Sequence, residues 1–274
     1  MAQSFDLSRI ALFLFDIDGV FLAGKSPPRR VSGTRILPAL RRRGLPFRLV
    51  TNTSTDPRTE VASNLCAQGI EVAAEDIHSA LEVTVHAAAE RFPRGRCFVF
   101  GEPGLGQAAA AAGLELVAGP PADVVLVGLN RFGDYRRLSL AARCLRQGAA
   151  LLGCHRNKMW HDDDGPAVSC GPWLAALEQA SGARAEIFGK PSAGFYAEAR
   201  APFGTAPEAT LMVGDDLEAD IAGAQRLGMA TALVLTGKTT RMALEASAIK
   251  PDGVLAEVDD LVELLPQEPP DGPT

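Results

Sequence analysis

Two carboxylates stand one residue apart at the end of an apolar run near the N-terminus. In the stretch ALFLFDIDGVF, residues 11–21, the apolar part ends at Asp16 and Asp18, and Gly19 follows. Three further apolar runs also end in polar side chains. These sets are Thr51 and Asn52 in PFRLVTN, Lys190 in EIFGKPS, and Asp215, Asp216 and Asp220 in LMVGDDLEADI.

These residue types point to phosphoryl chemistry assisted by a metal ion. Two aspartates held together in a crevice raise each other's pKa unless a cation joins them. Asp16, Asp18 and Asp215 offer hard oxygen ligands, and an all-oxygen set favours Mg²⁺ over zinc. Mg²⁺ commonly completes its shell with substrate phosphate, which Lys190 and the Thr51 hydroxyl would hold. A carboxylate also serves as a covalent nucleophile, so we expect one of the two aspartates to form an aspartyl phosphate.

The elements that must position these residues are short strands alternating with helices. The expected strands are IALFLFD, PFRLVTN, RCFVFG, DVVLVGLN, AALLGC, AEIFGK, ATLMVGDD and TALVLTG. Helical patterns lie between them, as in TRILPALRRRG, YRRLSLAARCLRQG and EADIAGAQRLG. This alternation is typical of βαβ units on a parallel sheet. Ligands of such a sheet bind beyond the carboxyl ends of its strands, where all four polar sets lie.

The chemically distinctive residues occupy two separate regions, 11–56 and 186–240. The long stretch between these regions has strands and helices but few paired acids, apart from those around Asp162. This layout predicts an α/β core domain whose chain is interrupted by an inserted domain.

The four polar sets resemble the four motifs of the haloacid dehalogenase (HAD) superfamily of phosphatases: DIDGV, TN, the lysine of FGKPS, and VGDDLEAD. The insertion between the second and third motifs resembles subfamily IIA, the C2-capped branch that includes NagD-like and 4-nitrophenylphosphatase-like proteins. Within this branch, GPWLAALEQASGARAEIFGKPSAGFY and GDDLEADIAGAQRLGMATALVLTGK look most like the phospholysine phosphohistidine inorganic pyrophosphate phosphatase subgroup. The resemblance implies a Rossmann-like parallel-sheet core at residues 1–79 and 185–274, with an inserted α/β C2 cap at residues 80–184.

The resemblance also implies a role for each motif residue in a Mg²⁺-dependent phosphohydrolase. Asp16 would be the nucleophile and a Mg²⁺ ligand. Asp18 would protonate the leaving group, activate water for hydrolysis of the aspartyl phosphate, and bind the metal through its backbone carbonyl. The remaining roles are phosphate binding for Thr51, Asn52 and Lys190, direct metal binding for Asp215, and a supporting or structural role for Asp216 and Asp220.

The substrate would be a small phosphorylated metabolite selected by the cap. A phosphomonoester is the main expectation, and pyrophosphate or a phosphoramidate is the alternative that the subgroup resemblance implies. The segment CHRNKMWHDDDGPAVSCGP, residues 154–172, is expected to be a cap loop before a helix that begins near Pro172. Two interpretations of this loop are open. The loop would either bring polar and aromatic side chains to the leaving group of the substrate, or it would be a solvent-exposed loop whose surface is hydrated by Asp162–Asp164. The candidate specificity residues are Arg156, Lys158, Trp160 and His161.

The composition of the chain limits the classes of binding partner and the cellular compartment that we expect for this protein. The chain has 274 residues, is 47% hydrophobic and has a formal charge of −6, which offers no general attraction to nucleic acid. The five cysteines form no CxxC pair, and their odd number does not suit a disulfide framework. The N-terminal apolar run is too short for a membrane span and is not a signal peptide. We therefore expect a cytoplasmic protein without nucleic acid or membrane partners, and the family resemblance adds a homodimer formed through the cap.

Four other interpretations compete with this one. Gly104, Gly106 and Ala109 follow a strand with the spacing of a loose dinucleotide fingerprint, although cap packing explains them more simply. Cys154, His155, His161 and Cys170 would suggest zinc, but their spacing fits no common template. A phospho-acceptor signalling module also uses an acidic cluster with Thr and Lys, and a non-catalytic interaction protein would use the same fold. Asp18 and the large insertion argue against the signalling module, and the intact motifs argue against the interaction protein.

Overall fold

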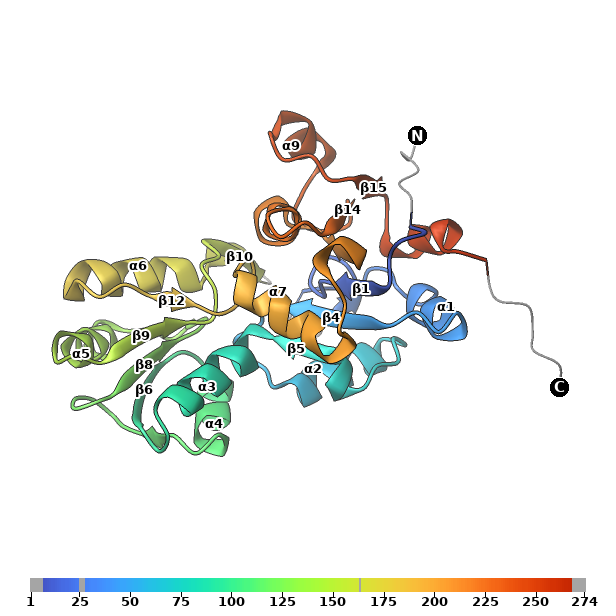
Figure 1. Cartoon of the computed structure of the whole chain (residues 1–274). Coiled ribbons are helices and arrows are strands. Elements are labelled where there is room, and N and C mark those ends of the chain that lie inside the picture. The colour runs from blue at the N-terminus through green and yellow to red at the C-terminus, as the bar shows by residue number, and fades with distance from the viewer. Residues whose placement is uncertain (1–6, 25–27, 163, 268–274) are drawn as a thin grey trace. The chain divides into compact units, whose positions relative to one another are not determined.

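The computed structural model describes residues 7–24, 28–162 and 164–267. Contacts between Cα atoms divide the chain into two compact units. Unit 1 consists of Met1–Thr51, Val61–His78 and Tyr196–Thr274, and unit 2 consists of Asn52–Glu60 and Ser79–Phe195. Each unit contains its own parallel sheet flanked by helices (Figure 1). The domain boundaries expected from the sequence stay a prediction.

Unit 1 is built on a six-stranded sheet in the order β15-β14-β13-β1-β4-β5. Interior strand β1 pairs in parallel with β13 and β4, so that Phe15 lies opposite Val213 and Leu49. Every residue of β1 is buried, as expected for a parallel strand covered on both faces. The strands are β1 (Leu12–Phe15), β4 (Phe47–Thr51), β5 (Ile77–Ser79), β13 (Thr210–Gly214), β14 (Ala230–Val234) and β15 (Gly253–Leu255).

Aromatic packing fixes β1 in the core of unit 1. The Phe15 ring lies 6.3 Å from that of Phe13 and 5.8 Å from that of Phe21, centroid to centroid. The helices along these parts of the chain are α1 (Ile36–Arg42), α2 (Arg58–Ala67), α7 (Ala193–Arg200), α8 (Gly223–Gln225) and α9 (Arg241–Ala246). Shorter pieces are the hairpin β2 (Leu22–Ala23) and β3 (Arg29–Arg30), the 3₁₀ turns η1 (Ala74–Asp76), η2 (Ala201–Phe203), η3 (Pro207–Ala209) and η5 (Val258–Leu264), and the π-helix η4 (Leu217–Ala222).

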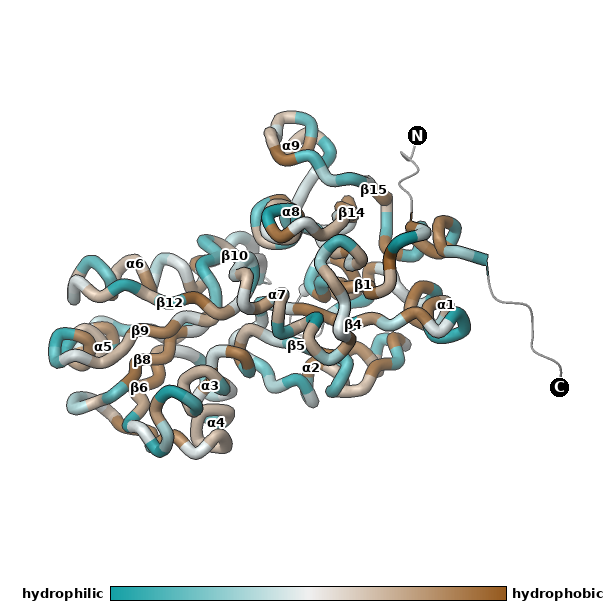
Figure 2. Tube along the Cα trace, viewed as in Figure 1, coloured by the Kyte–Doolittle hydropathy of each residue, from teal (hydrophilic) through white to brown (hydrophobic). Residues whose placement is uncertain are grey.

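Unit 2 is built on a five-stranded sheet in the order β12-β9-β8-β6-β7, and all of its pairs are parallel. Helices α3 and α4 pack together, as do α5 and α6, and the two pairs cover opposite faces of the sheet (Figure 1). Figure 2 shows the apolar residues concentrated along the strands. The strands are β6 (Arg96–Phe100), β7 (Glu115–Leu116), β8 (Val124–Val127), β9 (Ala150–Gly153) and β12 (Glu186–Ile187), and the helices are α3 (Ala80–Arg91), α4 (Pro103–Ala111), α5 (Tyr135–Arg146) and α6 (Cys170–Ser181).

The expected parallel-sheet α/β fold is confirmed, and each of the eight expected strands is present. Two local expectations are wrong. The segment 154–172 is not simply a loop, because it contains the antiparallel hairpin of β10 (Met159–Asp162) and β11 (Gly165–Val168). The helix expected to begin near Pro172 is present as α6, which begins at Cys170. Alternation of polar and apolar residues is weak in this hairpin, because it is not packed into a sheet core. The helix expected over EADIAGAQRLG begins as the π-helix η4 and becomes regular only in α8.

No helix in the described ranges combines the length and the apolar character that crossing a bilayer requires. Each of the five cysteines lies in those ranges and has a free thiol. Cys66 is exposed, whereas the other four are buried. Burial raises the pKa of the Cys97 and Cys154 thiols to about 12 and also raises the pKa of Cys144 and Cys170.

This burial predicts that only Cys66 reacts quickly with a thiol reagent in the native protein. The thiolate is the reactive form, so a thiol of pKa about 12 is deprotonated to only about one part in ten thousand at pH 8. Titration with Ellman's reagent should show one fast thiol before denaturation and five after it. Cys66→Ser should remove the fast thiol, and a second fast thiol in that variant would contradict the buried positions.

Candidate active site

Three neighbouring strands of unit 1 end in candidate catalytic residues. In the order β13-β1-β4, Asp215 follows β13, Asp16 follows β1, and Thr51 is the last residue of β4. The backbone N–H of Asp16 donates to the Val213 carbonyl over 2.9 Å, which extends the ladder to the first aspartate. Asp16, Thr51 and Asp215 are all buried. The parallel register therefore brings residues far apart in sequence to one edge of the sheet.

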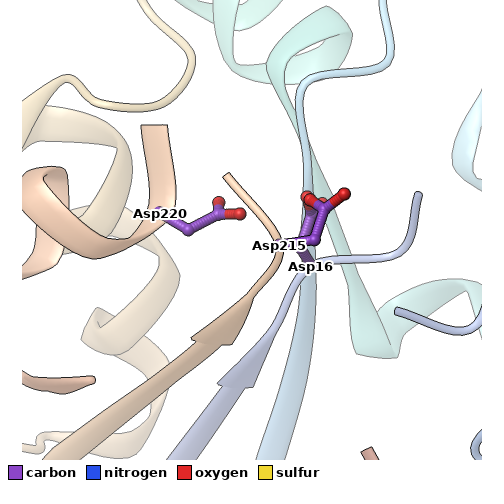
Figure 3. Close-up of side chains that lie close together, drawn as sticks. All are labelled: Asp16, Asp215 and Asp220. Atoms are coloured by element: carbon purple, nitrogen blue, oxygen red, sulfur yellow. The ribbon is translucent and has the colours of Figure 1, made fainter. Parts of the chain in front are cut away.

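Asp16, Asp215 and Asp220 form an acid cluster in which one carboxylate oxygen from each residue lies within 4.8 Å of the others (Figure 3). All three residues are buried, and Asp220 comes from η4. Three buried carboxylates repel one another strongly unless protons or a cation compensate them. Mg²⁺ takes hard oxygen ligands, so this donor set fits the ion that the sequence predicts.

Backbone N–H groups orient the three carboxylates. The Ile17 amide donates to Asp16 Oδ1 over 2.7 Å, and the Lys238 amide donates to Asp215 Oδ2 over 2.6 Å. The Asp216 amide donates to Asp220 Oδ2 over 3.1 Å. Such hydrogen bonds favour the ionised form of a carboxylate.

Glycines make room for these carboxylates. Gly19 has a φ of +81°, and a Cβ atom there would overlap the Asp215 carboxylate. A Cβ atom at Gly237 would overlap the same group, and one at Gly214 would overlap the Asp220 carboxylate. The backbone thus approaches the acid cluster more closely than a side chain would permit.

Asp216 has a structural role in these contacts. Its Oδ1 accepts hydrogen bonds from the Glu218 and Ala219 amides over 2.9 and 3.1 Å, which caps η4. Its Oδ2 pairs with Lys238 Nζ at 2.5 Å. Burial opposes ionisation, but the hydrogen bond and charge of Lys238 outweigh it, and the pKa of Asp216 is lowered. No role is predicted for Lys238 from the motifs, although its position directly after Gly237, beyond the apolar run of β14, was a usable signal.

The π-helix η4 has further support in unit 1. The Tyr196 side chain is fully buried, and its hydroxyl donates to the Ala219 carbonyl over 2.7 Å. A π-turn leaves its carbonyls without the regular helical pattern of donors, so this bond stabilises the turn that carries Asp220. Sequence periodicity alone does not distinguish a π-turn from the start of an α-helix.

Asp18 differs from the three acids because it is exposed and lies outside their cluster. It sits in a tight turn in which the Gly19 amide donates to the Leu22 carbonyl over 2.7 Å. The Thr236 hydroxyl donates to the Gly19 carbonyl over 2.6 Å and holds the same turn. An exposed carboxyl on a fixed turn is suited to proton exchange with a bound molecule.

In unit 2, Asn52 and Lys190 are joined by two hydrogen bonds. The Lys190 amide donates to Asn52 Oδ1 over 2.7 Å, and Asn52 Nδ2 donates to the Lys190 carbonyl over 3.0 Å. The Lys190 side chain is almost completely buried. The structure therefore places these two predicted phosphate-binding residues together.

The candidate specificity residues of the hairpin segment differ in their surroundings. Arg156 forms a two-point ion pair with Glu178 of α6, over 2.5 and 3.0 Å, and Lys158 is exposed. The Trp160 ring lies 5.8 Å from Arg131 Cζ. Asp163 and the side chain of His161 lie outside the described residues.

Comparison with known proteins identifies the family. A profile of the haloacid dehalogenase-like hydrolases matches residues 13–115, and a HAD-hydrolase-like profile matches residues 187–263. Human chronophin is 35% identical over 248 residues, which cover 84% of this chain and 83% of chronophin. The chain belongs to the HAD-like hydrolases.

Two solved structures agree with this membership. The p-nitrophenyl phosphatase from Archaeoglobus fulgidus has a TM-score of 0.86 at 31% identity, over 93% of this chain and 99% of that chain. Glycerol phosphate phosphatase Rv1692 from Mycobacterium tuberculosis, in complex with magnesium, has a TM-score of 0.79 at 27% identity, over 98% of this chain and 80% of that chain. The expected subfamily IIA is confirmed, and the chain is a phosphatase of the HAD type. The finer subgroup resemblance stays a prediction.

The glycine contacts give a test of the acid cluster. Gly19→Ala should weaken Mg²⁺ binding, because the new Cβ atom displaces the Asp215 carboxylate. Gly44→Ala is the matched control, since Gly44 also has a positive φ, of +64°, but its Cβ atom would meet nothing within 4 Å. Both changes should cost about 1 kcal/mol in the free energy of unfolding from backbone strain. Only Gly19→Ala should lower the rise in melting temperature on Mg²⁺ addition, and equal Mg²⁺ responses would contradict the close approach.

Proposed function

We propose that this phosphatase is a Mg²⁺-dependent phosphohydrolase that acts through an aspartyl phosphate on Asp16. The acid cluster of Asp16, Asp215 and Asp220 is the observation that carries the proposal. Three buried carboxylates at strand ends, with glycine backbone packed against them, suit a small hard cation. Asp16 and Asp215 would hold the ion together with the Asp18 backbone carbonyl. Asp220 lies close to these two residues, so we add it to the proposed metal-binding residues. It would bind the ion either directly or through a water molecule.

The ion would supply charge neutralisation for the phosphoryl oxygens when bound. Asp16 would attack phosphorus through a carboxylate oxygen, and the bond from phosphorus to the leaving oxygen would break. Asp18 would donate its proton to that oxygen, which departs as a hydroxyl group. Asp18 would then take a proton from water as the water attacks the aspartyl phosphate, so that phosphate and the free Asp16 carboxylate result. The proton that Asp18 takes up in the second step returns its carboxyl group to the protonated form that the first step requires.

Binding of the phosphoryl group would rest on three residues. Thr51 ends β4 beside β1, and its hydroxyl would donate to a phosphoryl oxygen. Asn52 would position the same group, and the buried Lys190 would neutralise its charge. Their mutual hydrogen bonds support a fixed Asn52–Lys190 pair.

A small phosphomonoester is the proposed substrate class, supported by the names of the relatives, which include a p-nitrophenyl phosphatase and a glycerol phosphate phosphatase. Pyrophosphate and phosphoramidates are the alternative carried by the subgroup resemblance. We also propose a cytoplasmic location, for which five free thiols are the support. A homodimer formed through residues 80–184 stays a prediction.

Asp16→Asn should abolish turnover, because an amide is a poor nucleophile toward phosphorus. Phosphate release from p-nitrophenyl phosphate with Mg²⁺ should fall at least about a thousandfold, or about 4 kcal/mol in activation free energy. EDTA should have the same effect on the unmodified protein. Glu245→Gln, which removes an exposed acid of α9, is the control for the loss of one charge and should keep full activity. Near-normal turnover by Asp16→Asn would exclude Asp16 as the nucleophile.

Asp18→Asn should slow turnover by about a hundredfold to ten-thousandfold, the usual contribution of a general acid–base. The loss should be larger for alkyl phosphates than for p-nitrophenyl phosphate, whose leaving group needs no proton. With the latter substrate, slow hydrolysis should let the phospho-enzyme accumulate, seen as a burst of one p-nitrophenol per active site. An equal loss for both substrates without a burst would rule out the acid–base role.

A further inference from the structure

The segment 236–239 follows β14 and lies against the acid cluster of unit 1. In the strand order β14-β13-β1, β13 lies between β14 and β1. To reach the turn after β1, the segment therefore crosses the end of β13, where Asp215 lies. A Cβ atom at Gly237 would overlap the Asp215 carboxylate, and a Cβ atom at Gly19 would lie only 2.9 Å from the Cα atom of Gly237. Glycine at both positions permits this close crossing.

The segment is bonded to both of the structures that it touches. The Lys238 amide donates to Asp215 Oδ2 over 2.6 Å, and the Thr239 amide donates to the Asp215 carbonyl over 3.2 Å. The Thr236 hydroxyl donates over 2.6 Å to the Gly19 carbonyl, in the turn after β1. One short segment thus connects a proposed metal ligand with the turn that carries the proposed acid–base residue.

The turn after β1 is closed by hydrogen bonds within itself. The Phe21 and Leu22 amides donate to the Ile17 carbonyl over 2.9 and 3.2 Å. These bonds fix the shape of the turn but not its position relative to the acid cluster. From outside, the Val31 amide donates to the Phe21 carbonyl over 2.8 Å, on the side of hairpin β2–β3. Thr236 bonds to the turn on the side of the acid cluster.

Proton transfer by Asp18 depends on the position of this turn. A general acid acts within hydrogen-bond reach of the leaving oxygen, and a displacement of about 1 Å can lower a rate about a hundredfold. Asp18 is exposed, so burial among core side chains does not fix it. The bond from Thr236 to the carbonyl of the next residue, Gly19, restrains Asp18 through the backbone.

We infer that Thr236 is a positioning residue, whose hydroxyl holds the turn of Asp18 in place relative to the acid cluster. This inference rests on the proposed function, since Thr236 acts only through the proton transfer of Asp18. A purely structural hydroxyl would stabilise the protein but would leave the relative rates of different substrates unchanged.

Three variants isolate the hydroxyl group. Thr236→Val removes it and keeps the shape of the side chain, and Thr236→Ala replaces this variant if the valine does not fold. Thr236→Ser keeps the hydroxyl and should restore the function. Thr205→Val is the matched control, because the Thr205 hydroxyl also donates to a backbone carbonyl, that of Phe203, over 3.3 Å. Thr205 precedes β13, at the end of that strand opposite the acid cluster.

The first measurement is hydrogen exchange of the full-length protein in EDTA, followed by mass spectrometry of peptides that cover residues 16–22. Exchange there should be about fivefold faster in Thr236→Val, because opening of the turn no longer breaks the bond to Thr236. Thr236→Ser and Thr205→Val should exchange in these peptides at the rate of the unmodified protein.

The second measurement is kcat/KM with Mg²⁺ for glycerol phosphate and for p-nitrophenyl phosphate. The ratio of the first to the second should fall about tenfold in Thr236→Val, because only the glycerol leaving group needs the proton of Asp18. Thr236→Ser and Thr205→Val should keep the ratio. In Asp18→Asn, which lacks that proton, the addition of Thr236→Val should not lower the ratio further.

The outcomes separate this inference from the proposed function. An unchanged exchange rate or an unchanged ratio in Thr236→Val would overturn the inference, and so would an equal loss for both substrates. A further fall of the ratio in the Asp18→Asn background would also overturn it, by showing that Thr236 acts independently of Asp18. These results would leave the phosphohydrolase intact. An unchanged ratio in Asp18→Asn alone would overturn the proposed acid–base role and this inference together.

Discussion

Burial of like charges is the constraint on which the rest of unit 1 depends. Asp16, Asp215 and Asp220 bring three carboxylates within 4.8 Å of one another in a buried place, where water screens their repulsion poorly. The fold meets this constraint in several ways at once. Amide N–H groups donate to each carboxylate, and glycines allow the backbone to approach them. Lys238 neutralises the Asp216 carboxylate, so that Asp216 adds no further uncompensated negative charge at the start of the turn that carries Asp220.

The same constraint gives aspartates that are neighbours in sequence different roles. Asp215 and Asp216 are adjacent in sequence, yet Asp215 belongs to the acid cluster whereas both oxygens of Asp216 are used by η4 and Lys238. Asp16 and Asp18 are only two residues apart, yet one is buried and the other is exposed. Backbone geometry, not the number of carboxylates, therefore divides metal binding from proton transfer in the proposed mechanism.

Much of this arrangement could be predicted from the sequence, because strand ends are local signals. The apolar runs before Asp16, Thr51 and Asp215 indicated strands, and the parallel-sheet rule indicated that their ends share an edge. The run before Lys190 also indicated a strand, but this strand, β12, belongs to the sheet of unit 2. Two features could not be found in this way. The π-turn of η4 depends on side-chain caps and on Tyr196, which comes from a distant helix. The hairpin β10–β11 lies in a polar segment whose pattern does not alternate clearly.

The parallel pairing of β1 with β13 has a consequence for the order in which the protein forms. A ribosome makes β1 at the start of the chain, but its partner β13 begins only at Thr210. All five strands of the unit 2 sheet are synthesised between these two, and they form a nearly continuous stretch of chain with short connections. Local contacts form before distant ones, since closing a long loop costs more conformational entropy. The sheet of unit 2 is therefore available to fold first on the ribosome, and the acid cluster is completed only after Asp220 has been translated.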